Sequence, residues 1–162
     1  MSDVYVMGVD MIKFGRFPDR TVPQIGAEAA LLALDDAGLT IHDMQAFYCG
    51  NLGQANAMVG QRILQEIGQT GIAVVNCANA CATGATAFRE AWMSIKAGVY
   101  DCVLAVGVEQ MGKGLLGGAG GGAAFPKKAY WDRALCRLFL PRQEWSMHET
   151  TAQPSSSLRK CR

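Results

Sequence analysis

The chain has 162 residues, half of them apolar, with a formal net charge of +1 and six cysteines, which is enough for one domain with a substantial core. No apolar run is long enough to span a bilayer, and the first residues lack the basic and apolar regions of a secretion signal, so we expect a cytoplasmic protein without a membrane span. The cysteine spacings contain no CxxC pair, which argues against a zinc or redox motif, and we expect no metal site.

Charge and glycine divide the chain into two parts. All 19 glycines lie at or before Gly122, and residues 1–122 carry 7 Lys/Arg against 11 Asp/Glu. Residues 123–162 carry 8 Lys/Arg against 3 Asp/Glu and end in a Ser/Arg/Lys stretch typical of disorder. This basic segment shows neither a charged helical face nor a repeated basic and aromatic pattern, so we expect no nucleic-acid partner.

The apolar patterns of residues 1–122 predict strands that alternate with helices. In chain order they predict a strand at 4–10, a helix from about 21 to 37, a strand at 46–50, a helix at 58–67, a strand at 72–77, a helix at 81–97 and a strand at 102–108. Glycines at 38, 68 and 98 mark the helix ends. Alternating strands and helices predict an α/β fold in which a mostly parallel sheet is covered on both faces.

The segment Gly107–Gly114 (GVEQMGKG) is close to the phosphate-binding pattern GxxxxGK[ST] and follows a predicted strand. Gly114 stands where that pattern needs a serine or threonine for Mg²⁺, and the glycines of 112–122 predict a flexible linker rather than a helix. Because a helix N-terminus is half of the phosphate-binding mechanism, we do not expect nucleotide binding.

The stretch from Ile72 to Ile95 contains the best candidate for chemistry. A β-branched run stops at Asn76, and an alanine-rich helical pattern begins at or just before Cys81. A cysteine between a buried strand and a helix lies in the field of the helix N-terminus, which stabilises thiolate over thiol. Cys81 is therefore the candidate nucleophile, although a buried structural cysteine would give the same local pattern.

The remaining cysteines and histidines of residues 1–122, and the second histidine of the chain, are weaker candidates. Three of the cysteines lie within predicted strands or at a strand end, where an apolar core role is the commoner one. Each histidine would be a base only if the fold brought it close to the candidate nucleophile. These side chains are Cys49, Cys77, Cys102, His42 and His148.

The segment VVNCANACATGATAFREAWMSIKAGVYDCVLAVGVEQM resembles the N-terminal half of a thiolase, closest to the sterol-carrier-protein thiolases and the bacterial lipid-transfer acetyl-CoA acetyltransferases. The shared features are Cys81 with the Ala-Thr-Gly that follows it, a helix that closes at Gly98, and DCVLAVGVEQM as the next strand. VYVMGVDMIKFGRF and AALLALDDAGL fit the same template, so the resemblance covers about 1–122. The β-ketoacyl synthases share the fold and a similar cysteine turn, but GVEQM favours thiolases.

The resemblance implies the N-terminal half of a thiolase-like fold and acyl transfer between acyl-CoA thioesters. Cys81 would accept the acyl group covalently, and its backbone N–H would contribute to an oxyanion hole. Coenzyme A and acyl-CoA would be substrates with no bound cofactor, and the full fold would form a homodimer.

Family members also use a histidine of a GHP-like motif and a second cysteine or histidine from a C-terminal half. This sequence contains neither motif, so only Cys81 is carried over. We therefore expect a truncated acetyl-CoA acetyltransferase-like enzyme that is inactive alone. A non-catalytic acyl-CoA-binding or interaction module with the same half-fold is the alternative.

Residues 123–162 do not continue the resemblance. Codons permitted for KKAYWDRALCRLFLPRQEWSMHETT, read one frame over, encode a continuous segment of the kind that such thiolases carry after the glycine run. We therefore expect two units, a thiolase N-terminal-like domain at 1–122 and a non-homologous, disordered segment at 123–162 that arose by out-of-frame translation.

Overall fold

A computed structural model describes residues 3–111 and the backbone of 133–141. The strands are β1 (Val4–Met11), β2 (Ala46–Gly50), β3 (Ala73–Cys77), β4 (Val103–Glu109) and β5 (Arg133–Pro141). The helices are α1 (Val22–Ala37), α2 (Val59–Ile67) and α3 (Thr83–Lys96), with short 3-10 turns η1 (Ile41–Asp43) and η2 (Ala55–Ala57). The strands and helices expected within 1–111 are all present.

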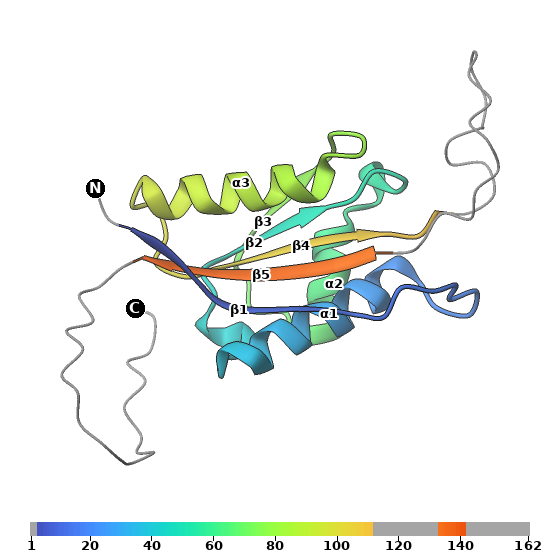
Figure 1. The fold of residues 1–162 in the computed structure, drawn as a ribbon, viewed down its shortest axis with the longest axis horizontal. Helices are drawn as coiled ribbons and strands as arrows, with labels where there is room; N and C mark the ends of the chain where they lie inside the picture. Colours follow the sequence, from blue (N-terminus) through green and yellow to red (C-terminus); the bar gives the residue numbers. More distant parts are fainter. Residues whose placement is uncertain (1–2, 112–132, 142–162) are drawn as a thin grey trace.

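The strands form one mixed sheet in the order β1-β5-β4-β2-β3 (Figure 1). β2 is parallel to both of its neighbours, with Tyr48 opposite Val75 of β3 and Ala105 of β4. β5 is antiparallel to β4 and to β1. The expected mixed, mostly parallel sheet is therefore confirmed, and the carboxyl ends of β2, β3 and β4 meet at one edge.

Helices cover both faces of the sheet: α1 and α2 lie on one face and α3 on the other (Figure 1). β2 shows how one strand serves both layers, since Phe47 and Cys49 belong to the core under α1 and α2, whereas Ala46 and Tyr48 face α3. Successive side chains of a strand point to opposite faces, so a strand buried on both sides is apolar throughout. All five residues of β2 are buried.

The ends of α1 follow the capping residues that the sequence contains. The Thr21 hydroxyl accepts a hydrogen bond from the Gln24 N–H (3.4 Å), and the Gln24 side-chain oxygen accepts one from the Thr21 N–H (2.9 Å), which completes a capping box. Gly38 ends the helix in the left-handed conformation, with φ 66°.

Three features differ from the sequence-based expectation. The strand before Cys81 was expected to be buried, but none of the five residues of β3 is buried, because it lies at the end of the described strand order. The helix expected from residue 81 begins at Thr83, with Ala82 as its N-cap, so Cys81 lies on the turn before the helix. A strand, β5, is present at Arg133–Pro141, in a segment for which the sequence predicted no packed structure. The expected glycine linker at 112–122 and most of 123–162 lie outside the described residues, so the division at residue 122 stays a prediction.

Candidate active site

Cys81 lies exposed on a tight turn between β3 and α3. The Ala82 N–H donates to the Asn79 carbonyl (2.9 Å), which closes a four-residue turn with Ala80 and Cys81 at its centre. Ala80 has φ 44°, a left-handed conformation that residues with a Cβ rarely adopt. Such a conformation costs on the order of 1–2 kcal/mol, so the surrounding contacts must hold it in place.

Two threonines of α3 provide those contacts. Thr83 is 6% exposed, and its hydroxyl accepts from the Asn79 N–H (2.7 Å) and donates to the Ala80 carbonyl (2.7 Å). The Thr86 hydroxyl accepts from the Asn79 side-chain amide (3.0 Å) and donates to the Ala82 carbonyl (3.0 Å). Both hydroxyls thus use a donor and an acceptor to join the turn to the first turn of α3.

Two glycines of the sheet let the start of α3 approach it closely. A Cβ on Gly50, at the end of β2, would lie 2.8 Å from the Thr83 carbonyl oxygen. On β4, a Cβ on Gly107 would lie 3.1 Å from the Cα of Gly84. Because side chains are missing on both strands, the helix start and the cysteine turn sit directly over the carboxyl ends of β2 and β4.

A second network, centred on Glu109, ties the loop after β2 to the end of β4. One Glu109 oxygen accepts from the backbone N–H groups of Leu52 and Gly53, both at 2.9 Å. The other accepts from the Asn51 side-chain amide (3.4 Å) and the Gln110 N–H (3.2 Å).

Asn51, 4% exposed, extends this network in three directions. Its side-chain amide also donates to the Val108 carbonyl (2.8 Å), and its side-chain oxygen accepts from the Gln54 N–H (2.7 Å). Its backbone N–H donates to the Cys77 carbonyl (3.2 Å), which links the loop to the end of β3, just before the cysteine turn.

The sequence identified GVEQM only as a family feature and did not predict the hydrogen bonds that Glu109 and Gln110 make. Gln110 donates through its side-chain amide to the carbonyls of Phe17 (2.7 Å) and Arg20 (3.1 Å), which anchors the loop between β1 and α1. The sequence places Asn51 and Glu109 directly after one predicted strand and at the end of another, but this signal becomes usable only once β2 and β4 are known to be adjacent and parallel.

The other described cysteines are poorly placed to react. Burial raises the pKa of Cys49 to about 12, so this thiol stays protonated at physiological pH. Burial, and then the Glu90 carboxylate, raise the pKa of the half-buried Cys77 above its usual value. Cys102 is fully buried beside Met44. Among residues 3–111, Cys81 is the exposed thiol.

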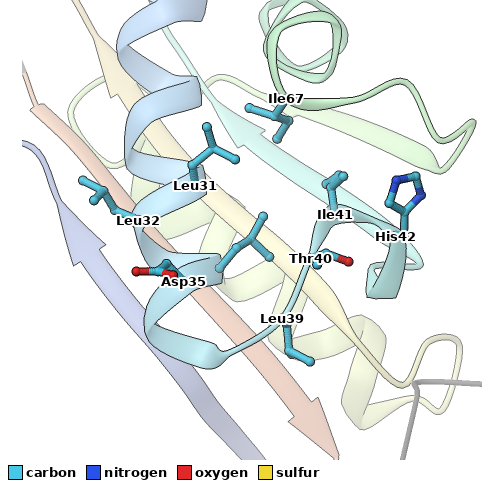
Figure 2. A pocket seen from close by; sticks show the side chains of 9 residues that line it. Leu31, Leu32, Asp35, Leu39, Thr40, Ile41, His42 and Ile67 are labelled. Carbon is cyan, nitrogen blue, oxygen red and sulfur yellow. The ribbon is translucent and has the colours of Figure 1, made fainter. Parts of the chain in front are cut away.

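His42 does not accompany Cys81. It lies in η1, which precedes β2, whereas Cys81 follows the carboxyl end of β3, and the two strands run parallel. His42 instead lines an apolar hollow of about 550 Å³, together with Leu31, Ile41 and Ile67 from α1, η1 and α2 (Figure 2). His148 lies outside the described residues.

Across 3–111 and 133–141, no helix combines the length and apolar character that crossing a bilayer requires.

Comparison with known proteins identifies the family. Residues 4–118 match the family model "Thiolase, N-terminal domain". Human sterol carrier protein 2 is 41% identical over 118 residues, which cover 70% of this chain and 21% of that protein. An acetyl-CoA acetyltransferase of Methanothermobacter thermautotrophicus is 36% identical over 115 residues, which cover 68% of this chain and 30% of that enzyme.

Solved structures agree on the fold. Xanthomonas campestris OleA, crystallised as a variant with lauric acid and lauroyl-CoA, superposes with a TM-score of 0.67 at 12% identity, covering 85% of this chain and 56% of that one. The chain thus spans about a fifth to a third of the length of the curated relatives named above. Because the family model matches residues 4–118, which is most of this chain, the chain belongs to the thiolase family.

Proposed function

We propose that this chain carries the nucleophile of acyl transfer between acyl-CoA thioesters, and that Cys81 is that nucleophile. The observation that carries the proposal is the exposed Cys81 thiol, on a strained turn at the start of α3, in a chain of the thiolase family. The Cys81 Sγ would attack the thioester carbonyl carbon. The new Sγ–C bond replaces the C–S bond to coenzyme A, which leaves as a thiolate and takes up a proton.

The local structure favours this step in two ways. α3 begins without a side-chain cap, so the positive end of its dipole would stabilise the oxyanion of the tetrahedral intermediate. Small, exposed neighbours, Ala78, Ala80, Ala82 and Gly84, leave room for a thioester beside Sγ.

We further propose that the chain as described stops after one acylation. Turnover needs a further acid–base group that acts on the second substrate once Cys81 has been acylated. Within 3–111 the histidine is His42, which precedes the amino end of β2, whereas Cys81 follows the carboxyl end of the parallel neighbour β3. The acyl group would then stay on Cys81 rather than pass to a second acyl-CoA.

Incubation with acetyl-CoA is expected to place one acetyl group on Cys81 and to release one equivalent of free coenzyme A. Peptide mass spectrometry locates the adduct, and a thiol reagent measures the coenzyme A. Cys81→Ala should lose the adduct and the release. Cys77→Ala is the matched control and should retain both, because its thiol has a raised pKa. An adduct that persists in Cys81→Ala contradicts the proposal.

The alternative is a non-catalytic acyl-CoA-binding module, which the position of His42 far from Cys81 favours. The same samples separate the two functions. Under the alternative, equilibrium dialysis shows saturable binding of acetyl-CoA, equal in wild type and Cys81→Ala, without any covalent adduct.

We also propose that the chain pairs with a second copy through β3, an edge strand among the described strands. Edge strands present unpaired backbone N–H and C=O groups, and Val75 on this strand is 40% exposed. Val75→Lys is expected to convert a dimer into a monomer in sedimentation experiments. Val99→Lys, the same change at a valine that is 63% exposed beyond α3, should leave the dimer intact. A wild-type monomer at high concentration contradicts the pairing.

A further inference from the structure

We propose that Thr83 is a positioning residue for Cys81, and that its hydroxyl fixes the turn from which the thiol attacks a thioester. The inference rests on the proposed function of Cys81 and adds the residue that orients it. Thr83 is the second residue after the nucleophile, and its hydroxyl hydrogen-bonds the backbone on both sides of Ala80, the residue before the nucleophile.

The geometry shows why a hydroxyl is needed at this position. Its oxygen accepts from the Asn79 N–H and its proton goes to the Ala80 carbonyl, both at 2.7 Å. These two groups flank the Ala80 Cα, whose φ of 44° an alanine does not adopt without support. The hydroxyl therefore holds the backbone in the conformation that sets the direction of the Cα–Cβ bond of Cys81.

The Thr83 methyl group connects the turn to the sheet. A Cβ on Gly50 would lie 3.1 Å from this methyl carbon, so the methyl packs directly over the end of β2. Thr83 is 6% exposed, so its two side-chain hydrogen bonds are shielded from competing water. Through Thr83, the cysteine turn is therefore held against β2 as well as against the start of α3.

Two substitutions separate the hydroxyl from the shape of the side chain. Thr83→Val keeps the methyl packing and removes the hydroxyl, whereas Thr83→Ser keeps the hydroxyl and removes the methyl. The readout is the rate of Cys81 acetylation by acetyl-CoA divided by its rate of alkylation by iodoacetamide, measured on the full chain. Alkylation needs only an accessible thiol, whereas attack on a bound thioester needs a defined direction.

Thr83→Val is expected to lower this ratio about tenfold, and Thr83→Ser to keep it within about threefold of wild type. A purely structural role would change stability in both variants and leave the ratio unchanged. A wild-type ratio in Thr83→Val, or an equal loss in Thr83→Ser, overturns the proposal. Circular dichroism confirms that each variant is folded before its rates are compared.

A double-mutant cycle with Ala80→Gly tests the link to the strained residue. Glycine adopts a positive φ without support, so Thr83→Val should lower the ratio less in the Ala80→Gly background than in wild type. Equal losses in both backgrounds contradict the proposed link.

Failure of the proposed function remains distinguishable from failure of this inference. If wild type forms no acetyl adduct, the function of Cys81 is wrong, and the role of Thr83 is decided by amide hydrogen exchange of Asn79. That N–H loses its acceptor in Thr83→Val but not in Thr83→Ser, so its exchange should accelerate only in the first. Unchanged exchange in Thr83→Val overturns the positioning role by itself.

Discussion

Replacing Gly50 with alanine is expected to lower the free energy of unfolding by about 1–3 kcal/mol, the usual cost of overpacking a core. A Cβ at this position would lie 2.8 Å from the carbonyl oxygen and 3.0 Å from the carbonyl carbon of Thr83. Both are main-chain atoms, so no side-chain rotation relieves the contact. Either β2, which pairs with strands on both sides, or the start of α3 must move.

Gly84→Ala provides the matched control for Gly50→Ala. A Cβ on Gly84 would lie 3.7 Å from the Cα of Gly107, which is an ordinary van der Waals distance. Because alanine favours a helix over glycine by about 0.5–1 kcal/mol, this variant should be as stable as wild type or more so. Gly50→Ala adds a methyl group where β2 contacts the start of α3, and Gly84→Ala adds one where the same helix start contacts β4.

Urea denaturation monitored by far-UV circular dichroism measures the difference. Gly50→Ala should lower the midpoint without changing the slope, and Gly84→Ala should not lower it. Because the displaced helix start carries the cysteine turn, acetylation of Cys81 should also slow in Gly50→Ala. Equal midpoints for Gly50→Ala and wild type would show that α3 is not seated on the sheet as described.

Local patterns predicted most of the fold because each element carries its own signal. The fully buried strand Ala46–Gly50 is a short apolar run, and α1 is bounded by a capping threonine and by Gly38. These signals act over a few residues and survive in a single sequence. The order of the strands did not follow from them, since β5 enters the sheet between β1 and β4 from a segment without a strand pattern.

The sequence predicted the position of the cysteine turn between a strand and a helix, but not its backbone conformation. An alanine at position 80 does not indicate a positive φ, because the residues that commonly adopt one are glycine, asparagine and aspartate. The support comes from Thr83 and Thr86, whose hydroxyls act on backbone groups a few residues earlier. Helical periodicity correctly predicts that both threonines lie in the helix, but it does not show their contacts with the turn. It also predicts a helix start at Cys81, whereas α3 begins at Thr83.

The Glu109 network could not be predicted from the sequence for a different reason. Asn51 and Glu109 are far apart in the sequence and meet only because β2 and β4 are adjacent and parallel. Without the sheet order, a glutamate at the end of a strand is indistinguishable from a surface charge. Its role therefore becomes visible only when the strands are paired.

Glu109→Gln is expected to lower the free energy of unfolding by about 1.5–3 kcal/mol, the range for hydrogen bonds to a charged group. Each carboxylate oxygen accepts two hydrogen bonds, one oxygen from Leu52 and Gly53 and the other from Asn51 and Gln110. A glutamine of the same shape must place its NH₂ group against one of these pairs of donors. At least two N–H groups then lose their acceptor, whichever way the amide is turned.

Glu66→Gln is the control, because Glu66 is an exposed glutamate on α2 and its neutralisation should change stability by no more than about 0.5 kcal/mol. Amide hydrogen exchange localises the effect. The N–H groups of Leu52 and Gly53 should exchange faster in Glu109→Gln, while those of β3 keep their wild-type rates. A Glu109→Gln variant with wild-type stability and wild-type exchange at Leu52 would mean that the carboxylate does not hold this loop, and that the edge of the sheet around Cys81 is fixed by α3 and its glycine contacts alone.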